Sequence, residues 1–491
     1  MRRVNLYEYR EGLDFGVEVG SVLAALAAEF AIVAWSLFQS KGIVFFRKYT
    51  AADVDGVSHS YYHTENMTIA RLLLIGFVVI AAVTAALAII DWLLQLHLTK
   101  LLLPVGVLVF CGVLSQAYLN PTGLFKHLLT IAAGFVCGIL VMFLIHFPMT
   151  ERLFRRICCV LIGLSGVFLI WGLIFQTNGS GAWVGPFQPG EVWKLLILLL
   201  SVIGFDMICR DASCRRLYLL TAAAMLLYVV LIRDLGNAVI IAALIAVMLI
   251  AVGQWKVVCS AAALGAAGGG LFLLLARLGL FSSVYSKIIS RFSQAGLYPL
   301  THWENSSANQ NLRAGLLALI RGGLIGSGVS GSNALYAQNV YASQTDFTFV
   351  CSISVFGILY GITVLLAIGV LLWNITPSLK ETGGANFRLY QGAVIGCLFL
   401  AQAAVHILGS LTLIPMTGVT LPFISAGGSS MAVSFMAAGA LAGLYLPKRH
   451  RAAIRDSGIF RLLSEFVNQD IPWPDIKLPA IHSDAECGRR N

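Results

Sequence analysis

The stretch at residues 413–430 reads LIPMTGVTLPFISAGGSS and decides how the fold of this chain is interpreted. It is rich in Pro, Gly, Ser and Thr, yet apolar runs long enough to cross a bilayer lie near residues 388–412 and 426–446. Backbone that breaks helical pairing at membrane depth must be buried in protein or line a wet cavity, because lipid offers no hydrogen-bond partner. The stretch is therefore predicted to form part of a functional site inside a membrane protein.

The composition is that of a polytopic membrane protein. Of the 491 residues, 58% are hydrophobic and only 11% are charged, and the mean hydropathy is +0.84. Ordinary soluble domains carry about 25% charged residues, so a soluble fold is excluded. The formal net charge of +10 is explained by Lys and Arg residues that hold loops in the cytoplasm. No basic run with interleaved aromatic residues indicates nucleic-acid binding.

The ten cysteines do not indicate disulfides or a metal site. Most of them lie inside apolar runs, where Cys behaves as a small hydrophobic residue. No C-x-x-C pair is matched by a second pair, which argues against structural zinc. The charged N-terminus MRRVNLYEYREG is not followed by a small-residue cleavage site, so the first apolar run is predicted to be a retained membrane helix.

Apolar runs of about 17 to 25 residues predict an all-α polytopic fold with about twelve membrane helices. Basic loops such as those at 152–156 and 210–216 share one side with the segment after the last helix, which places both termini in the cytoplasm. The basic residues of the loop at 39–68 contradict this orientation. The runs lie near 17–38, 69–96, 101–118, 126–147, 154–175, 192–208, 216–232, 236–253, 255–278, 348–373, 388–412 and 426–446.

Three regions follow from this pattern. Residues 1–68 hold an N-terminal membrane helix and a loop, residues 69–447 form the multi-pass membrane domain, and residues 448–491 form a polar cytoplasmic tail. The outward loop at about 279–347 is far longer than a connector needs, and long ordered loops are more often functional than idle. Its apolar residues at helical spacing predict a short amphipathic helix: Leu312, Leu316, Leu319 and Ile320.

The segment at 413–430 resembles the signature G-x-x-P-x-T-G-x-x-L-P-F-x-S-x-G-G-S-S of the SEDS family, whose members include RodA and FtsW. In that family the signature precedes the last membrane helix, as it does here. Thr412 replaces the leading Gly. The matching residues are Pro415, Thr417, Gly418, Leu421, Pro422, Phe423, Ser425, Gly427, Gly428, Ser429 and Ser430.

Four further motifs resemble the family in the same order along the chain. QPGEVWK at 188–194 is similar to Q-P-S-E-x-x-K, and DLGNA at 234–238 is similar to the end of Q-P-D-L-G-T-A. RGGLIGSGV at 321–329 is similar to a Gly-rich turn, and TDFTF at 345–349 is similar to T-D-F-x-F. The resemblance covers about 75–450. It implies a core of about ten membrane helices, with about two extra helices before it.

The family resemblance also implies a function. SEDS proteins polymerise glycan from lipid II at the outer face of the bacterial cytoplasmic membrane, during wall growth, cell shaping, division or sporulation. They work beside a class B penicillin-binding protein that cross-links the strands. The implied activity is an inverting peptidoglycan glycosyltransferase with a polyprenyl diphosphate donor. The alternative is a non-enzymatic lipid II handler, either a flippase or a scaffold for the transpeptidase. The implied substrate-binding residues are Lys194, Asp234, Thr345, Asp346, Ser425, Gly427, Gly428, Ser429 and Ser430.

This chemistry makes two demands on the polar residues. The leaving diphosphate needs Lys or Arg, oriented backbone N–H groups, or a divalent cation such as Mg²⁺ or Mn²⁺; no set of metal ligands is predicted here. The attacking sugar hydroxyl needs a carboxylate as general base. Glu304 stands where the family has its catalytic Asp, counted back without gaps from the Gly-rich turn, and is the candidate base. The alternative is a solvated carboxylate in a degenerate site, since the acidic pair after T-D-F-x-F is replaced by Ser354 and Val355.

Several of these residues also have a purely structural interpretation. Asp234 and Asp346 each precede a predicted helix, where capping is the simpler role. Lys194 either binds a phosphate or pairs with Glu191. Gly265 and Gly269 have the spacing of close helix packing, and His406 is predicted to be a buried polar contact.

Overall fold

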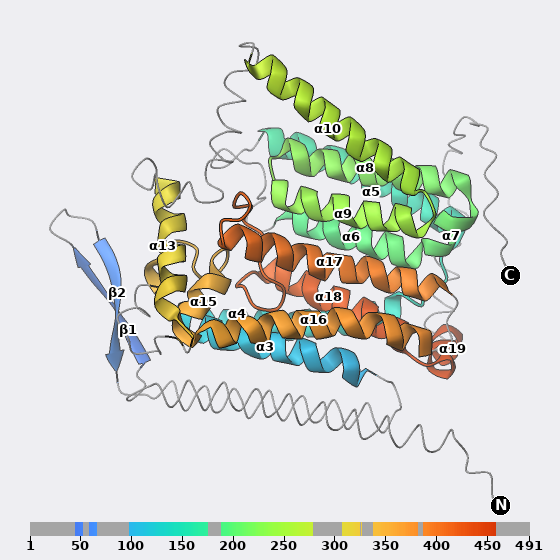
Figure 1. Cartoon of the computed structure of the whole chain (residues 1–491). Helices are drawn as coiled ribbons and strands as arrows, with labels where there is room; N and C mark the ends of the chain where they lie inside the picture. The colour runs from blue at the N-terminus through green and yellow to red at the C-terminus, as the bar shows by residue number, and fades with distance from the viewer. Residues whose placement is uncertain are drawn as a thin grey trace, which may run out of the picture.

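The computed structural model describes residues 45–52, 58–65, 98–174, 188–277, 307–324, 326, 337–381 and 386–457. Over this part of the chain the protein is a bundle of helices that run side by side (Figure 1). Helix α13 (Ser307–Gly322) lies near one end, and α7 (Phe205–Arg210) and α19 (Lys448–Asp456) lie at the other. The runs predicted near 17–38 and 69–96, the candidate base Glu304 and most of the tail lie outside the described residues.

Most predicted membrane runs form single helices close to the expected bounds. Seven helices of the described residues are long and apolar enough to cross a membrane, and α9 is a shorter apolar helix. The predicted all-α polytopic membrane fold is therefore confirmed. The predicted runs that form single helices are α3 (Thr99–Leu119), α4 (Leu124–Leu144), α5 (Glu151–Ile174), α8 (Ala212–Leu231), α9 (Leu235–Ala251), α10 (Trp255–Arg277), α17 (Asn386–Ser410) and α18 (Gly428–Tyr445). The seven candidate spans comprise six of these, without α9 and α10, together with α16 (Ile358–Glu381).

Two predicted runs are broken in the structure. The run near 192–208 divides at Gly204 into α6 (Pro189–Ile203) and α7 (Phe205–Arg210). The run near 348–373 divides at Gly357 into α15 (Thr348–Phe356) and α16 (Ile358–Glu381). Gly357 has φ +84° and ψ 174°, a conformation essentially restricted to glycine. Apolar periodicity does not register such a break because both halves remain apolar.

The break at Gly357 is where the Gly-rich turn packs. The predicted amphipathic helix is α13 (Ser307–Gly322), and it leads directly into this turn. The N–H of Ile358 donates to the carbonyl of Gly323 at 3.0 Å. A side chain at Gly322 would collide with the backbone of Ile353. The glycines of the turn thus allow its backbone to approach the broken helix closely.

The segment predicted as a loop at 39–68 contains a β-hairpin, which the sequence analysis did not predict. Strands β1 (Phe45–Ala52) and β2 (Ser58–Glu65) pair antiparallel, with Phe45 opposite Glu65. Aromatic and β-branched residues suit strands, and Asp-Gly at 55–56 is a dipeptide typical of hairpin turns. These signals are local and independent of the apolar runs that define membrane helices.

Helices α4 and α18 make the closest helix contact through glycines. Gly134 and Gly138 in α4 face α18, and the contact continues through Gly439 and Gly443 in α18. A Cβ at Gly138 would lie 2.7 Å from the carbonyl oxygen of Phe435. Both helices therefore carry the small-xxx-small spacing that lets backbones approach closely.

The packing role predicted for Gly265 and Gly269 is wrong within the described part of the chain. A Cβ at either position would meet nothing within 4 Å. Both glycines lie on α10, at positions exposed in the structure. Spacing alone could not distinguish these glycines from those of α4 and α18, because the partner helix is distant in sequence.

Replacing Gly439 with alanine is expected to destabilise the protein by about 1–3 kcal/mol, because the new methyl group would collide with the backbone of Gly138. Gly269→Ala is the matched control, since it makes the same change in a helix with open space around it. The measurement is the thermal unfolding midpoint of the detergent-solubilised protein. Equal midpoints for the two variants would contradict the close α4–α18 contact.

Candidate functional site

The segment between α17 and α18, residues 411–427, is called here the signature loop. Side chains from surrounding helices satisfy its backbone. Gln116 of α3 donates to the carbonyl of Ile424 at 3.2 Å, and Gln402 of α17 donates to that of Thr420 at 3.1 Å. The ring of His406 hydrogen-bonds the carbonyl of Val419 at 2.7 Å. From Val419 to Ser425 the broken backbone is thus largely buried in protein, as non-helical backbone at membrane depth requires.

The signature loop is held in a strained conformation at Phe423. This residue has φ +63°, a left-handed value that is an outlier for a bulky side chain. Its ring is buried, stacks on Phe399 at 5.7 Å and contacts Phe435 edge-on at 5.2 Å. Such strain costs on the order of 1–3 kcal/mol and persists only where packing enforces it. The loop therefore has one enforced geometry.

A buried ion pair lies beside this loop. Lys194 Nζ donates to Glu191 Oε1 at 2.9 Å, and the two side chains are 0% and 3% exposed. Both residues belong to the first turns of α6. Pairing, one of the two alternatives for Lys194, is therefore observed. Burying two charges costs several kcal/mol per ion, so a buried pair is weak evidence for stability and is more readily explained by a functional role.

A chain of polar side chains connects this ion pair to the start of α18. Lys194 Nζ also contacts Gln402 Oε1 at 3.4 Å, and Gln402 Nε2 donates to Ser430 Oγ at 3.2 Å. Ser430 forms a short hydroxyl–hydroxyl contact with Thr420 of the signature loop. The structure thus brings the predicted residues Lys194 and Ser430 together. Sequence reasoning missed Gln402, which bridges them, although an amide inside an apolar run was a usable signal.

Asp234 has the capping role that the sequence favoured. Its Oδ1 accepts the N–H of Asn237 at 3.2 Å at the start of α9. Its Oδ2 accepts the side-chain amides of Gln188 and Asn237, each at 2.9 Å. A Cβ at Gly190 would lie 2.8 Å from the same oxygen. Asp234 therefore fastens the start of α9 to the start of α6, next to the ion pair.

Thr345, Asp346 and Ser425 form a second group on the other side of the signature loop. Ser425 Oγ donates to the carbonyl of Thr345 at 2.8 Å and accepts the N–H of Leu421 at 3.0 Å. Burial raises the pKa of Asp346, whose carboxylate faces the position of Gly418. The predicted capping role of Asp346 is wrong, because Phe347 is the N-cap of α15 and no side chain caps that helix.

Gly427, Gly428 and Ser429 form the start of α18. Gly427 is the N-cap, with extended backbone at φ −173°, and Gly428 is exposed. The first N–H groups of a helix have no intrahelical partner, and the helix dipole makes this end positive. The residues of the GGSS motif are therefore placed to present backbone donors.

Three buried polar atoms near the ion pair have no hydrogen-bond partner within the described structure: Glu191 Oε2, Asn237 Oδ1 and His406 Nε2. They come from α6, α9 and α17, which pack on one another. Orphaned buried polar groups are rare in native proteins, so such a cluster indicates a place for water or for polar groups of a ligand.

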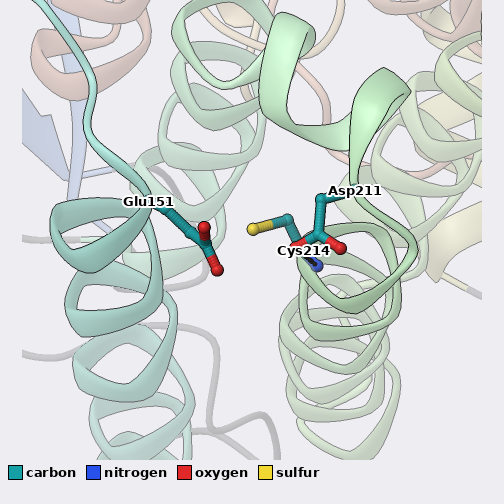
Figure 2. Close-up of side chains that lie close together, drawn as sticks. All are labelled: Glu151, Asp211 and Cys214. Atoms are coloured by element: carbon teal, nitrogen blue, oxygen red, sulfur yellow. Dashed lines mark hydrogen bonds between the residues drawn. The ribbon is translucent and has the colours of Figure 1, made fainter. Parts of the chain in front are cut away.

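A separate cluster of potential ligand atoms, Glu151, Asp211 and Cys214, lies where α5 and α8 begin (Figure 2). Its oxygens are already engaged. Arg155 Nη2 lies 2.7 Å from Glu151 Oε1, and Asp211 accepts the backbone N–H groups of Ser213 and Cys214. Burial acts to raise the pKa of Asp211, but these hydrogen bonds and Arg155 hold it below its usual value. The cluster is therefore a helix cap with an ion pair.

The comparison with known proteins agrees with the sequence motifs. The model of a family of cell cycle proteins, FtsW/RodA/SpoVE, matches residues 91–450. Stage V sporulation protein E of Bacillus subtilis is 28% identical over 373 residues, 71% of this chain and 95% of that protein. A protein named probable peptidoglycan glycosyltransferase FtsW, from Lactococcus lactis, is 28% identical over 315 residues, 55% of this chain and 72% of that protein.

A solved structure supports the same fold. It is described as "Structural coordination of polymerization and crosslinking by a peptidoglycan synthase complex". The similar chain superimposes with a TM-score of 0.52 at 20% identity, covering 72% of this chain and 97% of that one. Together with the family match over residues 91–450, this assigns the chain: it belongs to the FtsW/RodA/SpoVE family of cell cycle proteins.

Proposed function

We propose that this protein is a peptidoglycan glycosyltransferase that polymerises lipid II at the outer face of the bacterial cytoplasmic membrane. The observation that carries this proposal is the buried chain of side chains from Glu191 and Lys194 through Gln402 to Ser430. This chain joins the ammonium group of Lys194 to the start of α18, beside the signature loop. Relatives named probable peptidoglycan glycosyltransferase support the assignment.

Each part of the site has a role in this reaction. Lys194 and the N–H groups at Gly428 and Ser429 bind the diphosphate as it leaves, because both present positive charge. Glu304 takes the proton from the attacking sugar hydroxyl. The sugar oxygen then bonds to the anomeric carbon of the donor with inversion, while the bond to the diphosphate breaks. The polyprenyl tail stays in the bilayer between helices.

Asp234, Thr345, Asp346 and Ser425 position this machinery. Asp234 fixes α6 against α9, so it sets where Lys194 lies. Ser425 holds the signature loop to the segment before α15. The half-buried carboxyl of Asp346 is available to hydrogen-bond a hydroxyl or amide of the disaccharide-peptide. A divalent cation such as Mg²⁺ or Mn²⁺ would neutralise diphosphate charge in addition to Lys194.

The proposed partner is a class B penicillin-binding protein that cross-links the new strands. The fold shared with a chain from a complex of polymerisation and crosslinking supports this proposal. The decisive experiment is polymerisation of labelled lipid II by the purified full-length protein, with and without that transpeptidase. Glycan strands that grow in either arm support the glycosyltransferase.

A second candidate function is a non-enzymatic lipid II handler, either a flippase or a scaffold for the transpeptidase. The observation that favours it is the loss of acidic residues. Ser354 and Val355 replace the acidic pair and are fully buried in α15, and Glu rather than Asp stands at position 304. A wild-type protein that binds lipid II but makes no glycan, even beside its transpeptidase, would favour this function.

Both termini are proposed to be cytoplasmic, because the basic loops lie on the side of the segment that follows α18. Reporter fusions at Asn491 and within the loop at 279–347 are expected to report opposite sides of the membrane. The expected result is a cytoplasmic signal from the fusion at Asn491 and an outside signal from the fusion within the loop at 279–347. The same side for both fusions would contradict this orientation.

Replacing Gly427 with leucine is expected to weaken lipid II binding by roughly tenfold, because a branched side chain would cover the N–H groups that start α18. Its Cβ fits, with Ser430 and Thr420 each at 3.4 Å, so the protein is expected to fold. The measurement is binding of fluorescent lipid II to the purified variant. Ser260→Leu, an exposed position on α10, is the control. Unchanged lipid II binding by a folded Gly427→Leu variant would show that the GGSS motif has a packing role and does not bind the substrate.

A further inference from the structure

Helix α19 (Lys448–Asp456) follows α18 at one end of the bundle (Figure 1). Basic side chains gather at this end. Arg388 comes from the start of α17, Arg451 and Arg455 from α19, and His146 from the segment after α4. The charges of Arg388 and Arg455 both act on His146, and that of Arg455 acts on Arg388. Segments distant in sequence thus bring their basic groups together.

This group is short of partners. Nη1 of Arg388, Nε of Arg451 and Nε2 of His146 are buried without a hydrogen bond in the described structure. Arg155, Lys194 and Arg210, by contrast, each pair with a carboxylate within the described structure. Buried polar atoms normally have partners, and each orphan costs about 1–3 kcal/mol. The unpartnered N–H groups of Arg388 and of Arg451, which lies on the same helix as Arg455, indicate a missing acceptor at this end of the bundle.

The electrostatics require that acceptor to be an anion. Arg451 and Arg455 lie one helical turn apart, where like charges repel. Burial, together with the charges of Arg455 and Arg388, lowers the pKa of His146 to about 4. His146 is only 5% exposed, so water reaches it poorly. An anion bound among these side chains would offset the repulsion and accept hydrogen bonds from the free N–H groups of Arg388 and Arg451.

We propose that Arg388, Arg451, Arg455 and His146 form a binding site for the phosphodiester headgroup of an anionic phospholipid. The guanidinium forks of arginine match phosphate oxygens in a bidentate arrangement. The site lies at the ends of membrane helices, where headgroups of the bilayer lie, and α19 continues it with a basic sequence, KRHRAAIRD. Basic pockets between membrane helices are typical binding sites for such lipids.

The proposal is independent of the glycosyltransferase activity, because the ion pair of Lys194 and the signature loop lie elsewhere in the bundle. Bound lipid would fasten α19 against α4, α17 and the end of α18. The site would therefore anchor the helix from which the C-terminal segment continues. This gives a membrane lipid a structural role at the end of the fold.

The test uses the purified full-length protein after removal of lipid, titrated with phosphatidylglycerol or with phosphatidylcholine of the same acyl chains. Binding is counted by native mass spectrometry. We expect specific binding of phosphatidylglycerol, and Arg388→Gln is expected to weaken it by about tenfold. Lys256→Gln is the matched control, since it removes an exposed cation at the start of α10, and is expected to change binding by about twofold or less.

Three results would overturn the proposal. Equal binding of the two lipids would show that the basic group does not select an anionic headgroup. Wild-type binding by a folded Arg388→Gln variant would show that the lipid does not bind at Arg388. Inorganic phosphate that displaces phosphatidylglycerol and gives the same thermal stabilisation would assign a site for small anions instead. If Arg388→Gln fails to fold, Arg388→Lys keeps the charge without the fork, and an undiminished affinity there would equally overturn the proposal.

Discussion

Glu304→Gln is expected to lower the rate of lipid II polymerisation by roughly two to four decades. Glutamine keeps the size and the hydrogen bonding of the side chain but cannot accept a proton from the attacking sugar hydroxyl. Lipid II binding is expected to change little, because the proposed diphosphate contacts lie on α6 and α18. The measurement is the turnover of labelled lipid II beside its transpeptidase.

Two further variants make this result specific. Glu304→Asp is expected to retain activity, since it restores the residue type of the family at that position. Glu151→Gln makes the same chemical change in an exposed carboxylate at the start of α5, and turnover is expected to be unaffected. Wild-type turnover by Glu304→Gln would rule out this residue as the base. It would favour the alternative interpretation, in which Glu304 is a solvated carboxylate in a degenerate site.

Lys194→Met is expected to cost about 3–5 kcal/mol of stability, because it leaves the carboxylate of Glu191 buried without its partner. It is also expected to abolish detectable turnover, since the proposed contact with the diphosphate is lost. Both effects are measurable on one preparation, by thermal unfolding and by polymerisation of lipid II. Loss of activity in this variant alone would not separate the two causes.

The double variant Glu191→Gln with Lys194→Met separates them. Replacing a buried ion pair by neutral side chains of similar volume is often neutral for stability, so the unfolding midpoint is expected to recover. Turnover is expected to remain lost, because no cation faces the diphosphate. A double variant with wild-type turnover would show that the pair is only structural, and would leave the start of α18 as the sole candidate for diphosphate binding.

The sequence by itself determined the class of fold and most of the elements. Apolar runs predicted α3 to α5, α8 to α10, α17 and α18 within a few residues, because membrane helices satisfy their own backbone and their length follows from bilayer thickness. The stripe that predicted α13 is equally local. The Pro- and Gly-rich composition of residues 413–430 was enough to predict broken backbone, and the motif order was enough to indicate the family.

Only the tertiary structure decided which residues meet. Lys194 contacts Gln402 across 208 positions of sequence, and Arg388 lies near both His146 and Arg455. The glycines of α10 and α18 have the same spacing, yet only those of α18 have a helix against them. Spacing within one helix reports the face on which a residue lies, whereas the neighbour on that face is chosen by the packing of distant segments. The buried network and the basic group therefore became visible only in the folded chain.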